Sequence, residues 1–241
     1  MKPDFDAART WAQARIAATP LMPDPHWHGW VADVFPSDFY AALRAALPDD
    51  AAYTPLSADW DPAGDYAARR GLVIDDAADA LMDADRAGFW RELRTRTLGR
   101  AFGENLLRLA ESPVAARFRA EGTALGSWRT SLLLVRDRGG PGVLPHTSDP
   151  PNVLTLLFYL PPDDANRAQG TALYAPRDPD FRCWGGRHHG REAFTHAWTA
   201  PFLPNSLFWF VKDDMSFHGV EPAPRGDAVR DILLFYIKRT G

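Results

Sequence analysis

The sequence predicts an α+β fold in which a cupin-like jelly roll, the double-stranded β-helix, is braced by helices from the first half of the chain. Apolar residues at helical spacing dominate residues 4–121, whereas residues 122–241 carry short apolar runs separated by Gly, Pro and Asp clusters. Many short strands without intervening helices are typical of a sandwich or jelly roll. We therefore expect a single domain over 1–241, with a mainly helical part (1–121) and a jelly-roll core (122–241).

The elements follow in order along the chain. Ser37 is the expected N-cap of a helix over residues 38–47, which ends before Pro48. Apolar stripes between residues 75 and 111 predict two or three further helices. The predicted strands cover residues 131–135, 153–160, 171–174, 206–211 and 232–237. A jelly roll built from such strands can hold a metal at one open end.

Composition narrows the possible partners and compartment. The formal net charge of −4 leaves no basic footprint for a nucleic acid. No stretch is long and apolar enough to span a bilayer, and the first residues do not resemble a secretory signal. The single cysteine, Cys183, cannot form an intrachain disulfide, which fits a cytoplasmic location. The sequence contains no coiled-coil heptad from which an oligomeric state could be predicted.

Two histidines carry the strongest chemical signal. His146 and His218 lie 72 residues apart, and Arg230 follows the second histidine by 12. Two imidazoles with a nearby carboxylate are the ligand set of non-haem Fe(II) oxygenases. Because a jelly roll brings distant strand ends together, this separation is compatible with one metal site. A buried Arg230 needs a carboxylate partner, and its planar fork suits one. Arg225, which lies in an expected turn, is the second candidate for the arginine that binds a carboxylate.

From about residue 126 to 240 the chain resembles the 2-oxoglutarate and Fe(II)-dependent oxygenase superfamily, in particular its bacterial prolyl-hydroxylase-like and phytanoyl-hydroxylase-like members. The resemblance lies in residues 144–147 (LPHT), 156–161 (LLFYLP), 170–174 (GTALY), 204–210 (PNSLFWF), 216–222 (SFHGVEP) and 230–236 (RDILLFY). It implies a dioxygenase that uses Fe(II), 2-oxoglutarate and O2. It also implies that His146 and His218 bind iron and that Arg230 pairs with the distal carboxylate of 2-oxoglutarate.

The carboxylate of the family motif is displaced in this chain. The family places it two residues after the first histidine, where this chain has Ser148, and Asp149 follows. In a regular strand Ser148 would face the metal and Asp149 would point away. A bulge can re-aim a side chain, and Pro150 breaks any regular ladder here. We expect Asp149 to complete the metal site. The alternatives are an open site, as in the family's halogenases, and loss of metal binding.

Several further side chains are candidates for the co-substrate or the substrate. The Tyr159 hydroxyl is expected near the keto acid, with strand packing as the alternative. His188 and His189, in a Gly-rich loop, and Arg129, on the first core strand, are expected to contact substrate, with a solvated position as the alternative for all three. His26 and His28 lack a supporting ligand pattern and are expected to be structural.

The resemblance implies hydroxylation of an unactivated C–H bond in a small molecule, amino acid or peptide, with release of succinate and carbon dioxide. Two other classes stay open. A silent jelly-roll binding protein would keep the fold while lacking the third ligand. A hydrolase with a different metal would need neither oxygen nor keto acid. The sequence carries no readable substrate code.

Overall fold

The computed structural model of the chain describes residues 3–56, 69–138, 142–222 and 229–240. Two antiparallel sheets form its centre. The larger has the strand order β1-β9-β6-β11-β4-β3-β2 and the smaller the order β5-β10-β7-β8. The strands are β1 (His28–Val31), β2 (Thr54–Pro55), β3 (Arg69–Val73), β4 (Trp128–Arg138), β5 (Val143–His146), β6 (Asn152–Tyr159), β7 (Ala172–Pro176), β8 (Phe194–Thr199), β9 (Ser206–Val211), β10 (His218–Val220) and β11 (Val229–Arg239).

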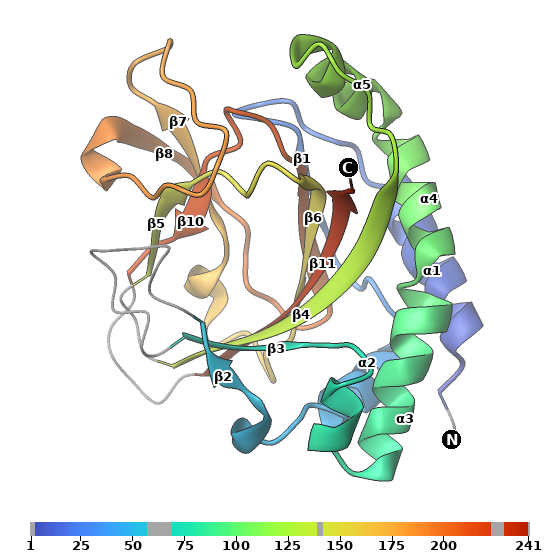
Figure 1. The fold of residues 1–241 in the computed structure, drawn as a ribbon. Coiled ribbons are helices and arrows are strands. Elements are labelled where there is room, and N and C mark those ends of the chain that lie inside the picture. The colour runs from blue at the N-terminus through green and yellow to red at the C-terminus, as the bar shows by residue number, and fades with distance from the viewer. Residues whose placement is uncertain (1–2, 57–68, 139–141, 223–228, 241) are drawn as a thin grey trace.

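Helices from the first half of the chain cover the outer face of the large sheet, and the small sheet lies on its other side (Figure 1). The helices are α1 (Phe5–Ala17), α2 (Ser37–Ala45), α3 (Ala84–Glu92), α4 (Arg100–Leu109) and α5 (Glu111–Ala120), with a π-helical turn at Leu93–Thr97. No helix among the described residues is long and apolar enough to cross a membrane.

The alternation of side chains along β4 divides the interior into two layers. Leu132 and Leu134 pack with the helices in the larger hydrophobic core, whereas Leu133 and Val135 face a second core on the side of the small sheet. Successive residues of a strand point to opposite faces, so one strand serves both layers. The pocket described below lies on the second face.

All five predicted strands are confirmed. β9 has the predicted bounds, β6 and β7 differ from them by one or two residues at each end, and β4 and β11 are two or three residues longer at each end. The helices are confirmed as well, but Ser37 is not a cap. The helix begins at Ser37 itself, Pro36 occupies the N-cap position, and no side chain caps it. The first part of the chain also contributes β1, β2 and β3 to the large sheet, which the helical spacing did not predict.

Candidate metal and co-substrate site

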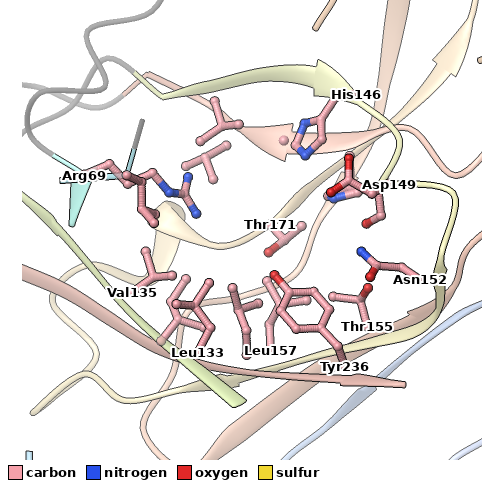
Figure 2. Close-up of a pocket in the computed structure, with 18 of the residues that line it drawn as sticks. Arg69, Leu133, Val135, His146, Asp149, Asn152, Thr155, Leu157, Thr171 and Tyr236 are labelled. Atoms are coloured by element: carbon pink, nitrogen blue, oxygen red, sulfur yellow. The ribbon is translucent and has the colours of Figure 1, made fainter. Parts of the chain in front are cut away.

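A cavity of about 460 Å³ opens between the two sheets (Figure 2). Its apolar floor comes from the large sheet. Polar and charged side chains surround this floor. The floor consists of Leu133, Val135, Leu157, Ile232 and Leu234, and the polar lining includes Arg69, His146, Ser148, Asp149, Asn152, Thr155, Thr171, His188, His218, Arg230, Tyr236 and Lys238. An apolar cavity with a few convergent polar groups is the usual form of a ligand site.

His146 and His218 lie directly opposite each other on β5 and β10, and their ring centroids are 4.4 Å apart. Each ring is oriented by its own backbone. His146 Nδ1 donates to the Leu144 carbonyl over 3.0 Å, and His218 Nδ1 donates to the Ser216 carbonyl over 2.9 Å. A carbonyl can only accept, so the proton of each neutral ring is on Nδ1. Both Nε2 atoms therefore keep the lone pair that a metal needs.

The electrostatic setting keeps both rings neutral. Burial lowers the pKa of His146 well below its usual value, and the neighbouring His218 and His188 lower it further. Burial also lowers the pKa of His218, to about 4. Metal binding requires unprotonated imidazole, so neither ring has to lose a proton at neutral pH.

Asp149 and Ser148 both line the cavity. β5 ends at His146 and β6 begins at Asn152, so the intervening residues are not held in strand alternation. The Asp149 carboxylate consequently points into the cavity beside His146 (Figure 2). Burial raises the pKa of Asp149, while Lys238 and Lys212 act against that rise. A bound cation would supply the missing compensation.

The residues present fit a metal in part. The two Nε2 atoms and a nearby carboxylate are a suitable donor set for iron. As the side chains stand, however, no three His, Cys, Asp or Glu groups of the described residues converge closely enough to hold an ion. Asp149 supplies the only carboxylate among the described residues that line this cavity.

The segment that carries Asp149 is held from two sides. Arg117, buried on α5, donates to the Pro150 carbonyl over 2.9 Å and to the Asn152 carbonyl. Thr147 Oγ1 donates to the Cys183 carbonyl over 2.8 Å. Backbone packing adds to this, because a Cβ on Gly185 would lie 2.3 Å from the Ser148 carbonyl oxygen. The helical half of the chain thus supports the loop beside the histidines.

The two adjacent histidines have separate environments. His188 forms a β-bridge with His146, and the two rings stack with centroids 4.3 Å apart and planes 3° apart. His189 points elsewhere. Its ring packs against Phe181, Phe194 and Phe217, and it does not line the cavity. The structure therefore brings His188 to the histidine pair and leaves His189 in a neighbouring aromatic cluster.

Arg230 lies in the same cavity, with its guanidinium partly satisfied. Nε donates to the Gln169 carbonyl over 2.6 Å, and Nη1 donates to Asp137 over 2.8 Å. Nη2 is buried with no hydrogen-bond partner among the described residues. A buried donor without an acceptor is costly, so a ligand carboxylate at Nη2 would stabilise it. The alternative, Arg225, lies outside the described residues.

Tyr159 does not line the cavity itself but is hydrogen-bonded to Thr171, which does. The Tyr159 hydroxyl donates to Thr171 Oγ1 over 2.8 Å and accepts from Thr171 N over 2.9 Å. Tyr159 itself is fully buried, whereas Thr171 lines the cavity. Arg129 is exposed opposite Lys238 in the β4–β11 ladder, and of these two only Lys238 lines the cavity.

No sequence pattern marks Arg69 as a site residue. It lies on β3, in a segment whose pattern gave no strand signal, and its guanidinium points into the cavity from the side opposite His146 (Figure 2). Arg69 Nε is 3.5 Å from Asp137 Oδ1. Only the pairing of β3 with β4 brings Arg69 to the cavity.

Comparison with known proteins places this fold. No family model matches the chain, and no curated protein matches its sequence. Solved structures do match. A Pseudomonas putida prolyl-4-hydroxylase has 15% identity and a TM-score of 0.55, with 95% of this chain and 100% of that chain covered. A Trichoplax adhaerens prolyl hydroxylase in complex with a hypoxia-inducible-factor peptide has 12% identity and a TM-score of 0.54, with coverages of 96% and 89%.

A third match is a non-haem α-ketoglutarate-dependent carbocyclase of nogalamycin biosynthesis, with 14% identity and a TM-score of 0.52 over 88% of this chain and 79% of that one. The chain therefore has the fold of the 2-oxoglutarate and Fe(II)-dependent oxygenases. The resemblance predicted from residues 126–240 is confirmed at the level of the fold, and the likeness extends over the helical half.

Proposed function

We propose that this protein is a 2-oxoglutarate-dependent non-haem iron dioxygenase, with its two sheets forming a double-stranded β-helix within one catalytic domain. One observation carries the proposal. The same cavity holds two opposed histidines with free Nε2 atoms and, at another wall, a buried arginine with an unsatisfied Nη2. A metal-chelating keto acid with a distal carboxylate satisfies both. The shared fold agrees with this assignment.

The proposed iron ligands are His146, His218 and Asp149. Bound Fe(II), 2-oxoglutarate and O2 supply an oxidant for an unactivated C–H bond and release succinate and carbon dioxide. Asp149 enters the set by rotating toward the histidines, since its segment lies outside regular strand. Arg230 receives the distal carboxylate of the keto acid, and Thr171, held by Tyr159, offers a hydroxyl beside it.

The substrate of the proposed reaction is a small molecule or an amino-acid-like group, and the expected outcome is hydroxylation. A cavity of about 460 Å³ accommodates a single side chain or a compact metabolite together with the keto acid. Its apolar floor excludes water and positions an aliphatic carbon. His188 is the proposed substrate contact within the cavity, with Arg129 and His189 farther from it. Two of the proteins with this fold are prolyl hydroxylases, and the Trichoplax protein is in complex with a peptide.

An anaerobic titration with Fe(II) and 2-oxoglutarate tests the proposal without a substrate. The metal-to-keto-acid charge-transfer band is expected in the wild type and in His196→Ala, whose histidine is exposed on β8. His218→Ala should abolish the band, and Arg230→Met should weaken keto-acid binding by at least tenfold. Absence of a band in the wild type, with no iron bound, would reject the proposal and leave a jelly-roll binding protein.

The same titration decides the third ligand. Asp149→Ala is expected to lose most of the band, whereas Ser148→Ala should retain it. If instead the band is indifferent to Asp149, the iron site is open on that side, as in a halogenase-like enzyme. Chloride dependence of the band would then be the next measurement.

A further inference from the structure

Three uncharged polar side chains gather on one wall of the cavity. Tyr236 on β11 and Thr155 on β6 are directly opposed, so their side chains project to the same face of the large sheet. Asn152 lies an odd number of residues before Thr155, so strict alternation would turn it to the other face. A register shift just before Lys238, the residue opposite Asn152, accounts for its position on the cavity side. Asn152, Thr155 and Tyr236 form what we call the polar wall, which lies beside Asp149 in Figure 2.

The polar wall has hydrogen-bonding capacity that the protein does not use. Asn152 is 5% exposed and Thr155 is 3% exposed. Asn152 Oδ1 and Thr155 Oγ1 are buried and have no hydrogen-bond partner among the described residues. Buried polar atoms are nearly always paired, because an unpaired one has lost its water without gaining a partner. Two such atoms on one cavity wall indicate a place where a ligand supplies the partners.

The backbone fixes the positions from which the polar wall projects. The Asn152 N–H donates to the Asp149 carbonyl over 2.9 Å, and the Asn152 carbonyl accepts a hydrogen bond from Arg117 on α5. Thr155 lies inside β6, which is paired with β11 on one side and with β9 on the other. Both side chains are therefore held in place before a ligand arrives, which lowers the entropic cost of binding.

The donors and acceptors of the polar wall select an uncharged ligand group. An asparagine amide both donates and accepts, and so does a threonine hydroxyl. Burial raises the pKa of Tyr236 to about 12, so its hydroxyl stays protonated and can donate. A carboxylate has no proton to donate to Asn152 Oδ1, and an ammonium cannot accept from the Asn152 amide or from Tyr236. A carboxamide carries a donor and an acceptor in one plane and can pair with the Asn152 amide through two reciprocal hydrogen bonds.

We propose that Asn152, Thr155 and Tyr236 determine the substrate specificity, and that the substrate carries a carboxamide group on an aliphatic body. The inference rests on the proposed function, which places iron at the histidine pair and the oxidised C–H bond above the floor. Leu157 and Leu234 are the next opposed pair of β6 and β11 on the same face, and both line the cavity. With the carboxamide held by the polar wall, the aliphatic body lies on these two leucines.

The test compares four probes of similar length: hexanamide, hexanoate, hexylamine and 1-hexanol. Each is titrated into protein saturated with Fe(II) and 2-oxoglutarate under anaerobic conditions, with the shift of the charge-transfer band as the readout. Hexanamide is expected to bind at least tenfold more tightly than each of the others. N-Methylhexanamide distinguishes the source of the group, because it binds as hexanamide does if the natural carboxamide is a peptide bond and weakly if it is a primary amide.

Three variants assign the preference to the polar wall. Asn152→Leu should abolish it, and Thr155→Val and Tyr236→Phe should each weaken hexanamide binding about tenfold. Thr155→Val should also raise the melting temperature of the ligand-free protein, because a methyl group replaces a buried hydroxyl without a partner. Thr130→Val is the matched control. Thr130 lies beside Gly103 of α4, on the helix side of β4, and does not line the cavity, so this variant should bind hexanamide as the wild type does.

Equal binding of the four probes to the wild type would overturn the inference. So would an affinity for hexanamide that is unchanged in both Asn152→Leu and Thr155→Val. A lower melting temperature of ligand-free Thr155→Val, with hexanamide binding intact, would assign this hydroxyl to the internal structure and remove it from the polar wall.

Failure of the proposed function gives a different result. If the wild type forms no charge-transfer band, the same four probes are compared by thermal shift of the metal-free protein. A preference for hexanamide that is lost in Asn152→Leu supports the carboxamide site on its own. Absence of that preference overturns the carboxamide site as well.

Discussion

Arg230 and Asp137 face each other across β11 and β4 and form a hydrogen-bonded ion pair of 2.8 Å beside the cavity that Arg230 lines. Asp137 therefore compensates the charge of the buried Arg230 guanidinium before any ligand binds. Asp137 keeps Arg230 charged and oriented in the empty protein. The distal carboxylate of the keto acid then binds the remaining donor, Nη2, and does not have to neutralise the whole guanidinium charge.

Asp137→Asn separates these two roles. Removal of one partner of a buried ion pair costs on the order of 3 kcal/mol, so the empty variant should unfold several degrees below the wild type. The carboxylate of 2-oxoglutarate replaces part of the lost charge. Thermal denaturation with and without Fe(II) and 2-oxoglutarate should therefore show a larger ligand-induced stabilisation in Asp137→Asn. Equal stabilisation of both proteins, with the exposed Asp180→Asn as control, would contradict this role.

Tyr159→Phe and Thr171→Val test how the Tyr159 hydroxyl contributes to co-substrate binding. Loss of the hydroxyl leaves the Thr171 amide without its acceptor, and we expect a loss of stability of about 1–3 kcal/mol. We expect Kd for 2-oxoglutarate to rise about threefold in Tyr159→Phe and about tenfold in Thr171→Val, since Thr171 lines the cavity. Tyr174→Phe is the control, because Tyr174 bonds Glu221 and does not line the cavity. An effect of Tyr159→Phe as large as that of Arg230→Met would indicate direct contact with the keto acid.

His188→Ala and His189→Ala form a matched pair of neighbours. His188 stacks on His146 and supports its orientation, so His188→Ala should weaken metal binding about tenfold, as loss of a group that orients a ligand commonly does. His189→Ala should lower the melting temperature, because its ring packs among aromatic side chains, and leave metal affinity unchanged. Isothermal titration with a divalent metal gives both values. Equal metal affinities in the two variants would refute an orienting role for His188.

His26→Leu addresses acid stability. Burial lowers the pKa of His26 well below its usual 6.5, and neither ring nitrogen has a hydrogen-bond partner among the described residues. The unfolded chain therefore binds a proton at His26 as the pH falls below 6.5, while the folded chain does not. Stability is complete above that pH and is lost on acidification. His26→Leu should flatten the fall in melting temperature between pH 7 and 5, unlike His196→Leu. A slope identical to the wild type would contradict this.

Arg117→Met tests the support of the Asp149 segment from α5. The variant loses two hydrogen bonds to the Pro150 and Asn152 carbonyls and leaves Glu121 with only its longer ion pair to Arg239, at 3.8 Å. We expect a lower melting temperature and, if Asp149 ligates iron, a metal affinity reduced about tenfold. Arg119→Met, an exposed position on the same helix, should change neither. Loss of stability without loss of metal affinity would separate the segment from the metal site.

The sequence was most informative where the signal is local. The strands that carry Tyr159 and Arg230 are long apolar runs, and the family resemblance implied that His146, His218 and Arg230 share a site. β10 has only three residues and β1 four, which is too short for a periodic signal. Their positions depend on pairing with distant strands, which no local pattern records.

Arg69 and His188 show the same limit within the site. The Arg69-Arg-Gly segment has no alternation that marks it as a strand, and it reaches the cavity only because β3 pairs with β4. The Gly-rich sequence around His188 predicts a solvated or substrate-binding loop. The hydrogen bonds of that loop to residues 145 and 147 place it beside His146. At Asp149, strand alternation was the wrong guide because β5 ends before that residue.

The contact of Arg117 with the Pro150 and Asn152 carbonyls also bears on how such proteins diverge. A helical layer that only covered a hydrophobic face could be exchanged between relatives at little cost. Here Arg117 of the helical layer contacts the loop beside the two histidines, and the same half of the chain also supplies Arg69 on β3. Recombination between homologues at the junction before Trp128 would break both connections at once, so the two halves of this chain are expected to be inherited together.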